Sequence, residues 1–462
     1  MSAVAGLAES GVTGLLEDPD READLLQSLA DRVLKRAAQR GADQAEVGVN
    51  SGLNREAGVR LGDVEVLEEA RDRGLRVTVY CKGCTGTAST GDLRPEILDQ
   101  TVDQALAIAR LTQPDAASGL AEPELMATSL PDLDLWHPSD VAMEALIARA
   151  QEVEQAGRAA DPRITNSEGA SVSVEAALSV YANSHGFVGV KRGTRFSQHC
   201  ILIASDESGM QRDYDWDARR RFSQLADPAT TGAEAARRTV ARLGAQRIPT
   251  GRFPVLFVPE IARGLIGHLI GAVSGGQLYR RASFLLDAAG TQVLPDWASL
   301  IESPRIQGGP ASAAFDGDGV ATRESALVAD GTLARYVLGT YSARRLGLET
   351  TANAGGVRNL RFEGGDMSYT DLIGEMQRGL IVTEVMGQGV NLVTGDYSRG
   401  AAGFWVENGE IVWPVEEITI AGHLKEMLTS IRAAGTDHDE RRGVQVPSLL
   451  VDGMTVAGQA AE

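Results

Sequence analysis

The chain of 462 residues has few of the side chains that build disulfide frameworks and metal sites, with only three cysteines and six histidines. Three cysteines are too few, and odd in number, for a disulfide framework in a chain of this length, which favours a reducing compartment. Zinc sites rely on histidine and cysteine ligands, yet no two histidines lie close enough in sequence to share one helix turn. The histidines are His137, His185, His199, His268, His423 and His438.

Long apolar runs and positive charge are also scarce. No apolar stretch reaches the ~18 residues of a membrane-spanning helix, and residues 1–14 lack the basic and apolar regions of a signal peptide. The 44 lysines and arginines are outnumbered by 63 acidic residues, which leaves a net charge of −19. Binding to nucleic acid or to an anionic membrane needs clustered cations. We therefore expect a soluble cytoplasmic protein without direct contact to either.

Motifs for familiar hydrolytic and redox sites are missing or incomplete. The sequence contains no G-x-S-x-G elbow and no phosphate-binding loop. Cys81 and Cys84 have the C-x-x-C spacing, but a zinc ribbon needs a second pair and a thioredoxin-like motif opens a helix. Here the pair follows an expected strand and encloses Lys82-Gly83, which predicts a hairpin turn with structural thiols. His199 and Cys200 are neighbours in a strand, where side chains alternate between faces, so they cannot chelate one ion.

The N-terminal half predicts an α+β domain over residues 21–235. Residues 1–20 are small and acidic, and we expect them to be poorly ordered. Apolar residues at helical spacing predict a helix from Glu22 to about Gly41, and a second helix is predicted at about 94–111. Short strands are predicted between them, at 45–49, 58–61, 64–70 and 75–80. A third helix at about 141–156, strands within 164–213 and a largely helical segment at 217–247 complete this half.

The C-terminal half predicts a β-rich domain over residues 236–462. It opens with a buried strand at 253–258 and a helix from Pro259, because proline suits the first helical turn. Mixed, mostly antiparallel strands follow, and a last helix is predicted at 423–431. The predicted fold class is therefore α+β with two domains, an N-terminal helix–sheet–helix unit and a C-terminal domain of mixed sheets with helices.

A glycine-rich run is the most distinctive segment of the chain. It reads GQGVNLVTGDYSRG from Gly387 to Gly400 and is followed by Gly403. Glycine permits positive φ and close backbone approach, so the run predicts tight turns beside a ligand or another chain. Asn408-Gly409, between two apolar strands, predicts a type I′ hairpin. On spacing alone, an ordinary glycine-rich meander remains the alternative.

Several blocks, this run first among them, resemble the TldE (PmbA) branch of the TldD/PmbA family. The other blocks are Tyr181–Phe187, Thr340–Gly347, Asn353–Gly356 and Val415–Gly422. The resemblance implies a two-domain, metallopeptidase-like subunit that pairs with a TldD-like zinc peptidase as a heterodimer. The complex would degrade unfolded peptides and trim leader or antitoxin peptides.

The family's TldD branch carries a His-Glu-x-x-x-His motif on a helix, and the corresponding helix here departs from it. With His268 in the first position, Leu269 stands where the general base would be and Val273 where the second histidine would be. The cysteine that completes the TldD metal site lies near the C-terminus, and this chain has no cysteine after Cys200. The resemblance therefore implies no catalytic residue, no metal and no cofactor in this chain, with the zinc in the partner.

Three functions follow as hypotheses. The first is a non-catalytic subunit whose glycine loop helps to hold a peptide beside the partner's zinc. The second is an autonomous peptidase or other hydrolase with an unrecognised site, and the third is a scaffold that stabilises TldD. The residues predicted to bind substrate or partner are Gly387, Gly389, Asn391, Gly395, Asp396, Tyr397, Ser398 and Arg399.

Overall fold

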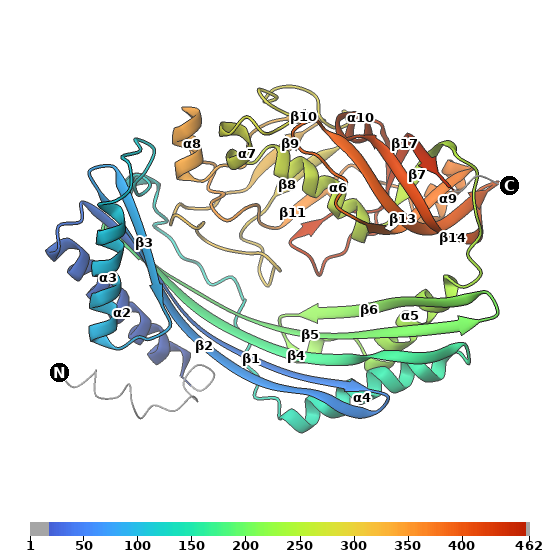
Figure 1. The fold of residues 1–462 in the computed structure, drawn as a ribbon, viewed down its shortest axis with the longest axis horizontal. Helices are drawn as coiled ribbons and strands as arrows, with labels where there is room; N and C mark the ends of the chain where they lie inside the picture. Colours follow the sequence, from blue (N-terminus) through green and yellow to red (C-terminus); the bar gives the residue numbers. More distant parts are fainter. Residues whose placement is uncertain (1–17, 459–462) are drawn as a thin grey trace. The chain divides into compact units, whose positions relative to one another are not determined.

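The structure, a computed structural model, describes residues 18–458 and separates into two compact units (Figure 1). Of the described residues, the N-terminal unit contains 18–202 together with Asp213–Ala236 and Ala313–Thr322, and the C-terminal unit contains the others. The predicted division between residues 235 and 236 stays a prediction, because the two units interleave along the chain. Most of the predicted poorly ordered segment, residues 1–17, lies outside the described residues, and helix α2 begins at Pro19.

The N-terminal unit is built on a six-stranded sheet with the order β3-β2-β1-β4-β5-β6. The strands and their bounds are β1 Gln44–Arg60, β2 Asp63–Cys81, β3 Cys84–Thr90, β4 Ile164–Asn183, β5 Val188–Asp206 and β6 Gly209–Arg219. The predicted hairpin at Cys81 and Cys84 is confirmed: the two residues are Cα partners, and Lys82 and Gly83 both have positive φ. This backbone is the one that a type I′ turn requires.

Four helices accompany this sheet, and α2, α3 and α4 pack on one of its faces (Figure 1). Their bounds are α2 Pro19–Gln39, α3 Pro95–Ala109, α4 Met143–Ala160 and α5 Pro228–Ala241. Alternate residues of the strands face these helices, so apolar side chains such as Val47, Val77 and Leu178 form a core with Leu26 and Val102.

Two predictions for this half are wrong in detail. The four short strands are two long ones, because the expected break at Arg73-Gly74 lies inside β2. Gly74 pairs with Asn50 of β1, so glycine here accommodates a neighbouring strand instead of turning the chain. The segment 217–247 is helical only in α5 and in a short 3-10 helix at Phe222–Gln224, because β6 continues to Arg219.

The C-terminal unit contains a ring of five strands in the order β14-β13-β12-β7-β17, and an additional pairing between β14 and β17 closes it. The bounds are β7 Gly251–Phe257, β12 Gly379–Met386, β13 Asp396–Glu407, β14 Glu410–His423 and β17 Leu449–Ala457, with β15 Ile431–Ala434 alongside β17. Only the pairing of β12 with β7 is parallel here. The predicted hairpin at Asn408-Gly409 is confirmed by its positive φ angles.

A five-stranded sheet and short helices complete this unit. The sheet has the order β10-β9-β8-β11-β16, with β8 Ser299–Glu302, β9 Ser325–Ala329, β10 Thr332–Leu333, β11 Leu360–Glu363 and β16 Val444–Gln445. The helices are α6 Pro259–Ala272, α7 Gly275–Tyr279, α8 Thr340–Leu346, α9 Tyr369–Met376 and α10 Leu424–Thr429. The predicted α+β class with mixed, mostly antiparallel sheets is confirmed. No helix within residues 18–458 has the length and apolar character needed to cross a membrane.

Candidate functional site

Helix α6 carries His268, the residue that the sequence resemblance placed at the first position of the TldD metal-binding motif. Pro259 occupies its first turn, and its apolar residues recur at helical spacing, so one face is buried in the core of the C-terminal unit. Leu269 and Val273 are completely buried in that core. His268, on the flank of the same helix, is half-buried. The two positions that lack the motif's residues are thus core positions, away from solvent.

Strand β13 brings two predicted site residues to this helix. Tyr397 and Arg399 are two positions apart on a regular stretch of strand, so their side chains share one face. The Tyr397 ring packs edge-to-face against His268 with centroids 6.1 Å apart. Arg399 donates from Nε to the carbonyl of Met386 at 3.0 Å. A histidine, a buried tyrosine and an arginine therefore meet at one end of the glycine-rich run.

The electrostatics of this cluster favour an uncharged histidine and an uncharged tyrosine. Burial, and secondly the positive charge of Arg399, lower the pKa of His268. Burial raises the pKa of Tyr397 to about 12, although Arg399 acts in the opposite direction. Arg399 forms no ion pair with any carboxylate among residues 18–458. The cluster therefore presents one positive charge beside two neutral polar rings.

The loop that precedes β13 is held by its own polar groups. The Asn391 side chain accepts from the backbone N–H of Val393 at 2.9 Å, and the N–H of Gly395 donates to the Asn391 carbonyl at 2.8 Å. Thr394 Oγ1 donates to the Asp396 carboxylate at 2.6 Å. Such side-chain-to-backbone bonds close tight turns. The predicted Asn391 and Asp396 therefore shape the loop.

His423, the last residue of β14, holds this loop, and the sequence did not reveal it. Its Nε2 lies 2.9 Å from the Thr394 carbonyl and its Nδ1 accepts from the N–H of Lys425 at 3.2 Å, so the proton belongs on Nε2. A Cβ on Gly395, whose φ is +87°, would lie 2.7 Å from this ring. The close approach explains why glycine is needed at 395. Nothing in the local sequence around His423 indicates a partner 29 residues away.

Two other glycines of the run are required by backbone contact. A Cβ on Gly389 would lie 1.9 Å from the carbonyl oxygen of Ser398, and one on Gly403 would lie 1.8 Å from that of Ile381. No side chain fits at such distances. These glycines therefore pack the strands β12 and β13 and the loop together, and an ordinary glycine-rich meander remains the alternative to a binding site.

The eight predicted residues do not form one cluster of side chains. Tyr397 and Arg399 face α6, whereas Asp396 and Ser398 are exposed and, by alternation, lie on the other face of β13. Gly387 and Gly389 are exposed in the loop and bring no side chain. The eight residues thus lie in one continuous segment, but their polar side chains are divided between the two faces of β13.

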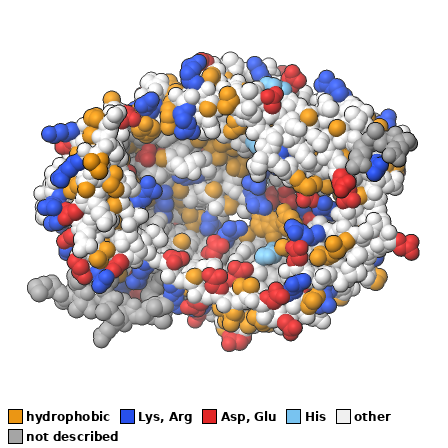
Figure 2. Space-filling model, viewed as in Figure 1, with side chains coloured by type: hydrophobic (Ala, Val, Ile, Leu, Met, Phe, Trp, Pro, Cys, Tyr) orange, Lys and Arg blue, Asp and Glu red, His pale blue; other side chains and the backbone are white. Residues whose placement is uncertain are grey.

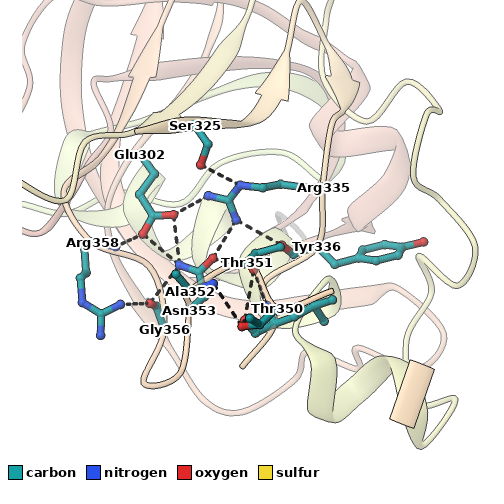
Figure 3. A network of polar contacts seen from close by, with 11 residues as sticks. Glu302, Ser325, Arg335, Tyr336, Thr350, Thr351, Ala352, Asn353, Gly356 and Arg358 are labelled. Carbon is teal, nitrogen blue, oxygen red and sulfur yellow. Dashed lines mark hydrogen bonds and ion pairs between the residues drawn. The ribbon is translucent and has the colours of Figure 1, made fainter. Parts of the chain in front are cut away.

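A second polar network in the same unit centres on Glu302, at the end of β8 (Figure 3). Its carboxylate, only 3% exposed, accepts from the Arg335 guanidinium, from Asn353 Nδ2 at 3.0 and 3.1 Å, and from the Arg358 N–H at 2.6 Å. Arg335 also donates to the Asn353 carbonyl oxygen at 2.8 Å. The network fixes the Asn353–Gly356 turn. Asn353-Ala354-Gly355-Gly356 stood out in the sequence, but its partners are 51 and 18 residues away.

The residues of α6 do not fit a zinc ion. A catalytic zinc needs three protein ligands, and here His268 packs against an aromatic ring while Leu269 and Val273 are apolar and buried. Within the part of the chain that the structure describes, no group of three or more His, Cys, Asp or Glu residues is arranged to hold a metal ion.

The fold and this helix define a metallopeptidase-like chain, and the chain belongs to the PmbA/TldD family. Three profiles of the PmbA/TldA metallopeptidase match it: domain 1 at residues 45–109, the central domain at 136–243 and the C-terminal domain at 250–458. The chain is 44% identical over 445 residues to the metalloprotease PmbA of Escherichia coli O157:H7, covering 96% of this chain and 99% of that protein. It is 22% identical over 427 residues to a metalloprotease TldD homologue of Haemophilus influenzae, covering 84% of this chain and 87% of that protein.

Solved structures share the same fold. A crystal structure from Bacteroides thetaiotaomicron, described as a modulator of DNA gyrase, superposes with a TM-score of 0.90 at 26% identity and covers 94% of this chain and 99% of that one. The crystal structure of TldE from Thermococcus kodakarensis superposes with a TM-score of 0.78 at 21% identity, covering 93% of this chain and all of that one. At this identity the second likeness concerns the fold alone.

Proposed function

We propose that this chain is the TldE-type, zinc-free subunit of a cytoplasmic two-subunit peptidase, and that a TldD-like partner holds the zinc. The complex acts on unfolded peptides, including leader or antitoxin peptides, and this chain helps to hold them. The observation that carries the proposal is the burial of Leu269 and Val273 in the core of the C-terminal unit. A general base and a second histidine would have to replace core side chains.

The relatives supply further support. The family contains chains named TldD as well as PmbA, and a solved protein named TldE has the same fold. If one branch of the family has metal ligands and the other lacks them, the two branches can supply the catalytic and the non-catalytic subunit of one complex. Direct action on DNA has less support, since the charge is −19 and acidic and basic side chains are intermixed on the face seen in Figure 2.

Zinc content and hydrolysis test this proposal. The purified chain is expected to hold no stoichiometric zinc and to leave an unstructured peptide uncut, and adding the TldD-like partner should produce hydrolysis. Elemental analysis that finds about one zinc per chain, the content of a single catalytic site, and its loss in His268→Ala would establish the autonomous peptidase instead.

The glycine-rich run is the part of the chain that we assign to the peptide chamber or to the partner interface. Exposed backbone at Gly387 and Gly389 and the guanidinium of Arg399 are the groups available for contact. In Gly395→Val the new side chain would collide with His423. We expect this variant to impair the assembled peptidase while the N-terminal unit remains folded. Circular dichroism of the variant after limited proteolysis should stay near that of the wild type treated in the same way.

The variant Arg399→Ala shows whether this residue contributes to the peptide chamber or to the partner interface. Weaker pairing with normal turnover at saturation indicates an interface residue, and normal pairing with about tenfold weaker peptide binding indicates a chamber residue, since truncated contact arginines typically cost 1–2 kcal/mol or more. Ser398→Ala, on the opposite face of β13, is the matched control and should change neither. If Arg399→Ala and Gly395→Val both leave assembly and hydrolysis unchanged, the run has no role in the chamber or the interface, and the ordinary glycine-rich meander is the correct interpretation.

A further inference from the structure

Strand β2 continues beyond the end of its outer neighbour. On its inner side β1 pairs with it from Asp63 to Tyr80, whereas on its outer side β3 pairs only with Leu75–Cys81. Within residues 18–458, no strand pairs with the outer side of residues 63–74. Residues 63–69 are all exposed. An open strand edge of this kind is a template for another extended chain.

The hairpin at the end of β2 establishes which backbone groups face the open side. Cys81 and Cys84 flank a two-residue turn, and residues in that position exchange backbone hydrogen bonds. The N–H and C=O of Cys81 therefore point toward β3. Because these groups alternate along a strand, the same holds for every second residue before Cys81, that is, for the odd-numbered ones.

The hairpin at the beginning of β2 leads independently to the same alternation. Arg60 and Asp63 flank the two-residue turn Leu61-Gly62, so the backbone groups of Asp63 point toward β1. Glu65 has no partner in the register and is the extra residue of a bulge, which shifts the alternation by one residue. Beyond it, the even-numbered residues bond to β1 and the odd-numbered ones face outward.

The outward backbone groups with no neighbouring strand belong to Leu67, Glu69 and Arg71. Three residues supply up to three N–H donors and three C=O acceptors to an added strand. The outward side of Arg73 is not open, since the chain that follows β3 lies beside it. A Cβ on Gly91 would be 3.6 Å from the Arg73 carbonyl oxygen. The open segment is therefore five residues long, from 67 to 71, enough for a short extended peptide.

The side chains along this segment indicate which peptide it suits. Val66 is 42% and Leu67 59% exposed, so both offer apolar surface to an added strand. Glu68 and Asp72 are exposed on the same face and form no ion pair within the described residues. Apolar contact together with unpaired carboxylates fits a chain that alternates apolar or neutral residues with basic ones.

We propose that the open side of β2, at Leu67, Glu69 and Arg71, binds an extended peptide segment that carries basic and apolar residues by strand addition. Main-chain pairing reads the backbone, and the acids select positively charged segments. The biological meaning of this site rests on the proposed role in peptide handling, but the site itself belongs to the N-terminal unit and needs no partner subunit.

Proline at an outward position is the direct test. Leu67→Pro removes one outward N–H and places a ring at the edge without removing a bond to β1. The full chain is titrated against a fluorescein-labelled, eight-residue peptide that alternates lysine with threonine and valine, and binding is followed by anisotropy. We expect Leu67→Pro to weaken binding about tenfold, the effect of one or two lost hydrogen bonds. Leu67→Ala, the matched control that keeps the N–H, should stay within about threefold.

Charge and hydrogen exchange provide two further readouts. The double variant Glu68→Gln with Asp72→Asn should weaken binding and reduce its dependence on salt, and a peptide with glutamate in place of lysine should not bind. Peptide should slow amide exchange in the segment 67–71 of the wild type but not of Leu67→Pro.

Three outcomes would overturn the proposal: no binding by the wild type, equal binding by Leu67→Pro and Leu67→Ala, or edge-to-edge dimers that Leu67→Pro abolishes while peptide has no effect. Pairing with a TldD-like partner, measured separately by light scattering, shows whether the proposed function fails on its own. Normal pairing and hydrolysis with no effect of Leu67→Pro on peptide binding would refute only this site.

Discussion

In the C-terminal unit, strands β14, β13, β12, β7 and β17 form a closed ring, whereas the sheet of the N-terminal unit ends on one side at the short strand β3, which leaves part of β2 unpaired. Closing a ring of strands removes free edges. It also forces backbones into close contact, which is why Gly403 has no room for a Cβ. The open sheet has glycine positions of both kinds: a Cβ on Gly48 of β1 would meet nothing within 4 Å, whereas one on Gly86 of β3 would lie 2.0 Å from the carbonyl oxygen of Ala105 in α3.

Alanine at Gly403 and at Gly48 should give the largest contrast. Gly403→Ala is expected to destabilise the C-terminal unit by at least ~3 kcal/mol, because its Cβ would overlap the Ile381 carbonyl and β12 or β13 must shift. Gly48→Ala should change stability by less than about 1 kcal/mol. Urea unfolding followed by circular dichroism measures both. Equal effects would mean that the ring is less tightly packed than the structure indicates.

Each unit also uses a buried glutamate to hold a turn, with different partners. Glu302 faces the Arg335 guanidinium, whereas Glu154 of α4, 1% exposed, accepts from the backbone N–H groups of Leu61 and Gly62 at 2.8 Å each. Glu302→Gln leaves a buried guanidinium without its counter-charge and should cost ~3–5 kcal/mol. Glu154→Gln keeps one acceptor and should cost about 1–2 kcal/mol.

Thermal unfolding of the two variants measures this difference. Arg335→Met combined with Glu302→Leu is the control, because removing both charges should recover part of the loss. A Glu302→Gln variant as stable as the wild type would show that the carboxylate's charge does not matter to the network.

One half-buried histidine in each unit, His199 and His268, allows the pH dependence of stability of the two units to be compared. The pKa of His199 in β5 is lowered by burial, against a raising effect of Glu56, and the pKa of His268 is lowered by burial and by Arg399. A histidine whose folded pKa is depressed contributes stability that is complete above its unfolded pKa of about 6.5 and is lost as pH falls through the folded pKa. We therefore expect stability to decline on acidification from about pH 7, less so in His268→Gln and His199→Gln.

Arg399 lowers the pKa of His268 but does not act on His199, so replacing it distinguishes the two histidines. Arg399→Gln should raise the pKa of His268 and leave that of His199 unchanged, as NMR titration of the imidazole protons can determine. No change at His268 would mean that burial alone lowers its pKa.

The smallest effect is expected from exchanging the residue types at the same position of two hairpin turns. Lys82 in the N-terminal unit and Asn408 in the C-terminal unit both have φ of +52° and precede a glycine. Asparagine tolerates this conformation better than lysine. Lys82→Asn should therefore stabilise the protein, and Asn408→Lys destabilise it, by about 0.5 kcal/mol each. Differential scanning calorimetry checks the signs, and a loss of stability in Lys82→Asn would show that side-chain contacts outweigh the turn preference.

Local signals determined much of this molecule. Gly83 and Gly409 predicted two hairpin turns and Pro259 the start of α6, all of which the structure contains. The glycine-rich run predicted tight turns beside a ligand or another chain; Gly389 and Gly395 make close contacts within this chain, and the ligand or second chain stays a prediction. These features depend on φ preferences and on neighbours in the chain, which a sequence displays directly. The family and the α+β class could be recognised from the same local blocks.

Tertiary structure alone decided which residues meet. Tyr397 lies against His268, His423 lies under Gly395, and Glu302 bonds to groups 33 to 56 residues away. Closure of β14 on β17 and the early end of β3 beside β2 likewise depend on register between distant strands. Such contacts come from packing two surfaces together, and the pattern of residues along one segment carries no record of the surface that it will face.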